Sequence, residues 1–126
     1  MNIIQTPDAP KAIGPYSQAV VEGALVFTAG QLPIDPVTGE VRTGDIAAAA
    51  RQALSNLRAV LVAAGADMTT VLKTTVFLKD MRDFPVFNGV YAEFFKEPFP
   101  ARSCVQVAAL PKDALIEIEA VATRRT

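Results

Sequence analysis

The sequence contains no histidine, and its only cysteine is Cys104. Without histidine, neither a Ser-His-Asp nor a Cys-His catalytic group can form, and no metal can be held by imidazole. A single cysteine also excludes an internal disulfide and a zinc or iron–sulfur site built from cysteine. Any chemistry must therefore use carboxylates, Arg, Lys, Tyr, hydroxyls, amides, backbone groups or this one thiol.

A strong charge of either sign is also missing. The chain has 12 Lys and Arg against 13 Asp and Glu, spread along its length, so no basic stripe is available to neutralise nucleic-acid phosphates. No apolar run approaches the roughly 20 residues of a membrane-spanning helix, and the first residues lack the features of a signal peptide. With 51% hydrophobic residues, the composition predicts one soluble domain over 1–126, and the unpaired thiol fits a reducing cytoplasm.

The apolar pattern predicts strands and helices that follow an irregular arm of ten residues. Thr43 or Asp45 suits the cap of the first helix, and Gly65 suits its left-handed end. The expected elements are two short strands within 20–29, a helix over 46–64, a strand over 71–79, a helix opened by Asp80, and strands over 102–107 and 114–123. Strand pairs at both ends suggest hairpins, so we predict an α+β fold with a mixed sheet and two helices packed on one face.

The second face of this sheet is expected to be apolar as well. In the central strand, Leu72, Val76 and Leu78 alternate with Val71 and Phe77, so large apolar side chains point to both sides. Two helices can cover only one face, and an exposed apolar sheet of this size is unfavourable in a monomer. The pattern therefore predicts that the chain oligomerises through its uncovered face.

Arg102 is the first candidate for a functional side chain. Pro98 and Pro100 set the direction in which the chain enters this strand, and alternation places Arg102 and Cys104 on the same face. The planar guanidinium fork suits a carboxylate or a phosphate. The alternative is an ordinary surface arginine in a weak ion pair.

A second candidate is the pair of glutamates in the last strand. Alternation sends Ile116 and Ile118 to one face and Glu117 and Glu119 to the other. Either both carboxylates face solvent, as is usual on the wet side of an antiparallel sheet, or one of them lies in a pocket. A pocket glutamate next to an arginine would be held ionised and could orient water as a general base.

Three further polar residues suggest a site, although each has a simpler explanation. Asn88 lies near Tyr91 on an aromatic helix face, where its amide could serve a ligand or only complete core hydrogen bonds. Tyr16 could line a pocket or only anchor the N-terminal arm. Cys104 is a possible nucleophile, but a lone strand cysteine without a nearby base is more often a small buried residue. An arginine for an anion, a carboxylate for water, and an amide and a phenol for orientation together suit hydrolysis of a small organic acid without a metal or cofactor.

Four short segments of the chain form a recognisable pattern: IGPYSQ (13–18), TAGQ (28–31), PARSCV (100–105) and IEIEA (116–120). With these segments the chain resembles the RidA family, also called the YjgF family. The resemblance runs over essentially the whole chain, in order and at the family's spacing, and residues 102–117 are its most specific part.

The resemblance implies a chorismate-mutase-like α+β fold that assembles as a homotrimer, with active sites in the clefts between subunits. It also implies hydrolytic deamination of reactive 2-imino acids or their enamine tautomers, such as 2-iminobutanoate and 2-iminopropanoate. The products would be 2-keto acids and ammonia. The imines would come from pyridoxal-phosphate enzymes, while the protein itself would need no cofactor and no metal.

The same resemblance implies roles for individual residues. Arg102 matches the arginine that grips the substrate carboxylate, and Glu117 matches the glutamate that positions or activates the attacking water. The remaining matches line the cleft, through the side chains of Tyr16 and Asn88 and mainly through backbone hydrogen bonds of Gly30 and Cys104.

One position departs from the family pattern, because Ala29 stands where many archetypal members carry serine. The loss of that hydroxyl leaves open a paralogue that acts on another imine or enamine. A second alternative is a regulatory or chaperone-like trimer that binds small acids without converting them. Arg102 would serve in both cases, so Glu117 is the residue that distinguishes an enzyme from a binding protein.

Overall fold

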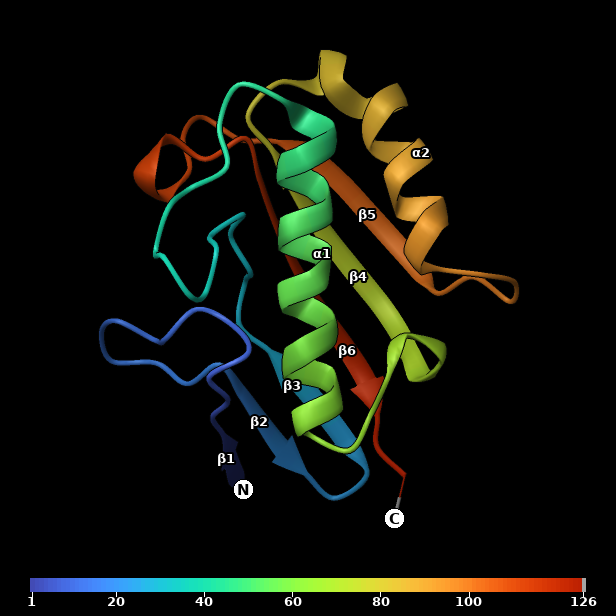
Figure 1. Cartoon of the computed structure of the whole chain (residues 1–126). Helices are drawn as coiled ribbons and strands as arrows, with labels where there is room; N and C mark the ends of the chain where they lie inside the picture. The colour runs from blue at the N-terminus through green and yellow to red at the C-terminus, as the bar shows by residue number, and fades with distance from the viewer. Residues whose placement is uncertain (126) are drawn as a thin grey trace.

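The computed structural model describes residues 1–125, which form a six-stranded sheet and two α-helices (Figure 1). The strands are β1 (Asn2–Ile4), β2 (Ala19–Glu22), β3 (Leu25–Thr28), β4 (Val71–Leu78), β5 (Ala101–Gln106) and β6 (Ile116–Thr123). The helices are α1 (Ile46–Ala63) and α2 (Phe84–Phe94), with 3₁₀ turns η1 (Met68–Thr70), η2 (Met81–Asp83) and η3 (Pro111–Asp113). Both α-helices lie over the same face of the sheet (Figure 1), so the predicted α+β fold is confirmed.

The strand order is β1-β2-β3-β6-β4-β5, with β4 and β5 parallel and the other pairs antiparallel. The predicted hairpin of β2 and β3 is confirmed, but the predicted hairpin of the last two strands is wrong. Helix α2 connects β4 to β5, as a parallel pair requires, and β6 then enters the sheet between β3 and β4. Ile116 and Ile118 are fully buried in β6, which suits this central place.

Helix α1 begins and ends where the sequence predicts. The Asp45 carboxylate accepts a hydrogen bond from the backbone N–H of Ala47 at 3.0 Å, and Gly65 has the positive φ of +84° that ends the helix. Asp80, in contrast, opens the turn η2, and α2 itself begins four residues later at Phe84. Helix α1 buries one continuous row against the sheet, including Ala50, Leu54, Leu57 and Leu61.

A β-bulge in β4 changes the predicted alternation. Val71 is buried, whereas Leu72 is 50% exposed and Lys73 is exposed too. The pairing with β6 shifts by one residue between Val71 and Lys73, so two consecutive side chains leave the core side. The predicted grouping is therefore wrong at this end of the strand. Val71 lies on the core side with Val76 instead of with Phe77, and Leu72 does not lie with Val76.

The N-terminal arm is more ordered than its composition suggests. Residues 2–4 pair with β2 as an edge strand, where we expected irregular structure. Gln18, which is only 3% exposed, donates from Nε2 to the carbonyls of Thr6 at 3.1 Å and Pro10 at 2.8 Å, and accepts from the Thr6 N–H at 2.7 Å. Because these contacts join residues that are not neighbours in the sequence, only the tertiary structure reveals the fixed path of the arm.

The face of the sheet away from the helices carries exposed apolar side chains, as predicted. Leu25, Phe27 and Val105 are 37%, 41% and 44% exposed. Glu117 and Glu119 lie on this same face, paired in register with Phe77 and Thr75 of β4. None of the helices within residues 1–125 is long and apolar enough to cross a membrane.

Candidate functional site

A cavity of about 540 Å³ lies beside the N-terminal arm, the segment after β3 and the turn before β6. Three residues of the predicted site line it: Tyr16, Gly30 and Glu117. Its other lining residues include Ala29, Gln31 and Lys112. A volume of this order suits a small organic molecule. A larger hollow of about 730 Å³ on the arm shares Tyr16, but its lining residues within 1–125 include no carboxylate.

Glu117 supplies the acidic group of this cavity. It is half-buried between two fully buried isoleucines of β6. Burial raises the pKa of the Glu117 carboxyl, and the neighbouring Glu119 carboxylate raises it further. A carboxylate with a raised pKa accepts a proton from water more readily, which suits a general base.

At Gly30 the backbone closely approaches the side chain of Glu117. A Cβ atom at this position would lie 2.7 Å from the carboxyl carbon of Glu117 and 2.8 Å from its Cγ. Such distances are far inside van der Waals contact. Gly30 therefore leaves space for the Glu117 carboxylate, a role that adds to the backbone hydrogen bond implied by the family resemblance.

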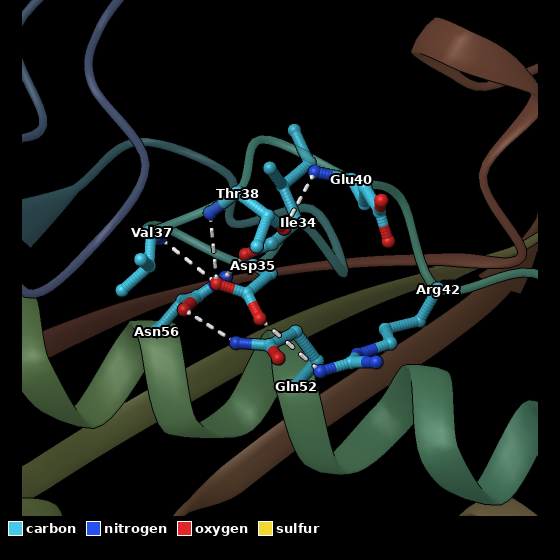
Figure 2. A network of polar contacts seen from close by, with 8 residues as sticks. All are labelled: Ile34, Asp35, Val37, Thr38, Glu40, Arg42, Gln52 and Asn56. Atoms are coloured by element: carbon cyan, nitrogen blue, oxygen red, sulfur yellow. Dashed lines mark hydrogen bonds and ion pairs between the residues drawn. The ribbon is translucent and has the colours of Figure 1, made fainter.

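The buried side chain of Asn56 connects the segment after Gly30 to helix α1 by hydrogen bonds (Figure 2). Asn56 is 1% exposed and donates from Nδ2 to the carbonyl oxygens of Leu32 at 3.0 Å and Ile34 at 2.8 Å. Its Oδ1 accepts from Gln52 Nε2 at 3.0 Å. Sequence reasoning missed Asn56, although an asparagine inside an apolar helical row is a signal for such a buried contact.

Asp35 stabilises the rest of this loop (Figure 2). Its Oδ1 accepts from the backbone N–H groups of Val37 at 2.8 Å and Thr38 at 3.2 Å, and Oδ2 pairs with Arg42 at 3.2 Å. The hydrogen bond from Val37, followed by that from Thr38, lowers the pKa of Asp35. These contacts close the loop on itself, and the residues just before it, Leu32 and Ile34, line the cavity.

Replacing Asn56 with alanine is expected to lower the free energy of unfolding by about 1–3 kcal/mol. The Ile34 carbonyl loses its side-chain donor, and the Leu32 carbonyl keeps only the N–H of Ile34. Urea unfolding at a fixed protein concentration measures the change. Gln52→Ala is the control, since it removes only a partner of Asn56 and leaves both carbonyls satisfied. Equal stability of the two variants would contradict this account.

Arg102 and Asn88 meet on the helix-covered side of the sheet. Arg102 Nη1 donates to Asn88 Oδ1 at 2.9 Å, and the guanidinium carbon lies 4.7 Å from the centre of the Tyr91 ring. None of the ion pairs within residues 1–125 includes Arg102, although its side chain is partly buried. This cation therefore keeps most of its donors for an external anion.

Cys104 lies on the same face of β5 as Arg102, as alternation predicts. Burial raises the pKa of the Cys104 thiol, and the positive charge of Arg102 only partly opposes that effect. The thiol is therefore protonated at neutral pH and is a poor nucleophile.

The two groups of residues are separated within one chain. In the sheet, Arg102 lies level with Thr74 and Ala120, whereas Glu117 lies level with Phe77 and on the opposite face. From the ordinary rise per residue and strand spacing, the Cα atoms of Arg102 and Glu117 are roughly 14 Å apart. The expected placement of an arginine next to the pocket glutamate is thus not found inside a single chain.

Residues 6–124 match the family described as Endoribonuclease L-PSP. The chain belongs to this family. Among similar sequences, the "RutC family protein PH0854" of Pyrococcus horikoshii is 58% identical over 120 residues, covering 95% of each chain. The "2-iminobutanoate/2-iminopropanoate deaminase" of Escherichia coli strain K12 is 54% identical over 125 residues, covering 97% of each.

A solved structure agrees with this assignment. The crystal structure of the YjgF gene product from E. coli superimposes with a TM-score of 0.93 at 52% identity, covering 99% of this chain and 100% of that one. Membership of the RidA or YjgF group, indicated by the four sequence segments, is therefore confirmed. The roles of the individual site residues stay predictions.

Proposed function

We propose that this protein hydrolyses small 2-imino acids, such as 2-iminobutanoate and 2-iminopropanoate, to 2-keto acids and ammonia. The observation that carries this proposal is Arg102, a partly buried cation with no carboxylate partner within residues 1–125. Such a cation is well suited to bind the carboxylate of a small acid. The name of the relative with 54% identity from E. coli supports the same reaction.

In the proposed mechanism, Arg102 binds the substrate carboxylate and thereby orients the adjacent C=N carbon. Glu117 accepts a proton from a water molecule as its oxygen bonds to that carbon. Glu117 passes this proton to the imine nitrogen, so the tetrahedral adduct carries one hydroxyl and one amino group. The hydroxyl proton is then transferred through Glu117 to the amino nitrogen, the C–N bond breaks as the C=O bond forms, and a 2-keto acid and ammonia leave. The C=N carbon is itself electrophilic, so orientation and one general base supply the catalysis without a cofactor.

This mechanism requires two copies of the chain. A substrate of a few carbon atoms cannot touch Arg102 and Glu117 of the same chain when they lie on opposite sheet faces. We propose that Arg102, Asn88 and Cys104 of one subunit face Tyr16, Gly30 and Glu117 of another in a homotrimer. The exposed apolar residues Phe27 and Val105 on the uncovered face support such an assembly.

Activity is tested in a coupled assay. An amino-acid oxidase generates the imine from 2-aminobutanoate, and semicarbazide competes for the imine before it becomes 2-oxobutanoate. Faster release of keto acid in the presence of this protein is the expected result. No acceleration by a folded oligomer would overturn imine hydrolysis and would favour a protein that binds small acids without converting them.

A mixing experiment tests whether the site is shared between chains. Arg102→Ala and Glu117→Gln are each expected to be inactive alone, and they are co-expressed with different tags so that mixed oligomers can be isolated. If each site of a trimer takes Arg102 from one chain and Glu117 from the next, one of the three sites in every mixed trimer is intact, so the isolated mixed trimers should have about one third of the wild-type activity. Recovery of activity supports the shared site, and none would place the site within one chain.

The word endoribonuclease in the family description raises the alternative of RNA cleavage. The balanced charge of 12 basic and 13 acidic residues does not favour a polyanionic substrate. Incubation of the same preparation with a labelled RNA, with Glu117→Gln in parallel, tests this alternative. Cleavage that Glu117→Gln abolishes would favour RNA as the substrate.

Gly30→Ala is expected to lower kcat/KM by about 10- to 100-fold, because the new methyl group displaces the Glu117 carboxylate. The melting temperature should change little, since the displaced atoms are the flexible end of a side chain. Gly89→Ala on α2 is the matched control, because a Cβ there meets nothing within 4 Å. Full activity of Gly30→Ala would show that the position of the Glu117 carboxylate is unimportant.

A further inference from the structure

We propose that Tyr91 positions Arg102 for carboxylate binding, and that Thr74 holds the Tyr91 ring in place. The inference rests on the proposed role of Arg102 as the anion-binding group. It gives a function to two buried residues that the mechanism does not bring into contact with the substrate.

Two side chains of helix α2, Asn88 and Tyr91, contact the guanidinium group of Arg102. Asn88 and Tyr91 are three residues apart and so lie on one side of the helix. Asn88 accepts the hydrogen bond from Nη1 at 2.9 Å, and the guanidinium carbon lies 4.7 Å from the centre of the Tyr91 ring. The rings of Phe84 and Phe87 are farther away, at 5.3 and 5.8 Å, so Tyr91 makes the nearest aromatic contact.

The Tyr91 ring is itself held on two sides. Its hydroxyl makes a hydrogen bond of 2.8 Å with the hydroxyl of Thr74, which is fully buried in β4 and pairs with Arg102 in the parallel register. The ring also stacks on Phe95, with centres 4.4 Å apart and planes inclined by 27°. Burial raises the pKa of Tyr91, so the phenol stays protonated and keeps its contact with Thr74.

These contacts fix the plane of the guanidinium group. Arginine has a long, flexible side chain, and its ordering has an entropic cost each time a ligand binds. The one hydrogen bond that Arg102 donates to Asn88 restrains a single nitrogen, whereas the face of a fixed ring restrains the whole plane. Arg102 is thus oriented before the carboxylate arrives, and that orientation depends on the ring of Tyr91.

The test measures the dissociation constant of 2-oxobutanoate, the carboxylate product, by calorimetry on the purified oligomer. Tyr91→Leu is expected to weaken binding by about tenfold. Phe94→Leu is the matched control, because it removes a ring from the same helix that lies under a different arginine, Arg58, at 5.1 Å. A purely structural role of Tyr91 would lower the amount of folded protein but would leave the dissociation constant unchanged.

Equal dissociation constants for Tyr91→Leu and the wild type would overturn the proposal. If Tyr91→Leu does not fold, Tyr91→Phe and Thr74→Val carry the test, because each removes only the hydrogen bond between the hydroxyls. Each is expected to weaken binding by about threefold, and unchanged binding in both would also overturn it. Wild-type protein that binds 2-oxobutanoate but does not hydrolyse imines would refute the proposed function while leaving the positioning role intact.

Discussion

Arg102→Ala is expected to lower kcat/KM for a 2-imino acid by about 10²- to 10⁴-fold, because the substrate carboxylate loses its charged, forked partner in a partly buried site. Both kinetic constants should change. KM rises since the carboxylate binds less tightly, and kcat falls since the C=N carbon is no longer held in one orientation. The coupled semicarbazide assay measures both constants, on variant protein that has the same oligomeric state as the wild type.

Two further variants make this result specific. Arg102→Lys keeps the charge but loses the planar fork, so we expect an intermediate loss of about 10- to 100-fold. Arg58→Ala removes another arginine that lies over a phenylalanine of α2, and it should leave the kinetics unchanged. Activity of Arg102→Ala within about threefold of the wild type would contradict a role in substrate binding, and dissociation into monomers would make Arg102 a structural residue.

Glu117→Gln is expected to lower kcat by about 10²- to 10⁴-fold with little change in KM, because the amide keeps the shape of the side chain but cannot accept a proton. Glu119→Gln is the matched control, since Glu119 lies two residues away on the same strand and face. Its activity should stay close to that of the wild type. Full activity of Glu117→Gln at saturating imine would refute the general-base role.

The raised pKa of Glu117 gives a second measurement of the same role. As a base, Glu117 must be ionised, so kcat should fall on acidification through a pKa above the ordinary glutamate range, chiefly because the group is buried. The pH profile of Glu117→Gln should lack this fall of kcat at acidic pH, whereas the profile of Glu119→Gln should still show it. An unchanged fall of kcat in Glu117→Gln would mean that another group titrates.

Stability is expected to change in the opposite direction to activity. The folded-state pKa of Glu117 is raised, so its contribution to stability is present at low pH and is lost as the pH rises through that value. Glu117→Gln should therefore unfold at an equal or higher urea concentration than the wild type at neutral pH. The difference in stability between Glu117→Gln and the wild type should decrease as the pH is lowered.

Local sequence patterns predicted most of the secondary structure. The alternation around Arg102 and around Glu117 correctly assigned these side chains to sheet faces, because the two-residue period of a strand is a local property. The β1 strand, the bulge beside Leu72 and the central place of β6 were missed or wrong. Each of these depends on which distant strand supplies the pairing partner.

The candidate site could be predicted only in part. Its six residues were named from sequence motifs, but the motifs do not show that Tyr16, Gly30 and Glu117 gather at one cavity while Arg102 joins Asn88 elsewhere. That division depends on the order of strands in the sheet, which no short segment encodes. The residues that support the site, such as Asn56 and Thr74, were missed for the same reason, because their contacts join segments that lie far apart in the sequence.

The sequence by itself determined which chemistry is excluded, where the helices and most strands lie, and which family the chain belongs to. These properties depend on residue type and short-range periodicity, which are visible without coordinates. Only the tertiary structure decided that Arg102 and Glu117 lie on opposite faces, that Gly30 makes room for a carboxylate, and that Tyr91 lies under the guanidinium. Such relations arise when distant segments pack together, and they require two copies of the chain if one substrate is to reach both charged groups.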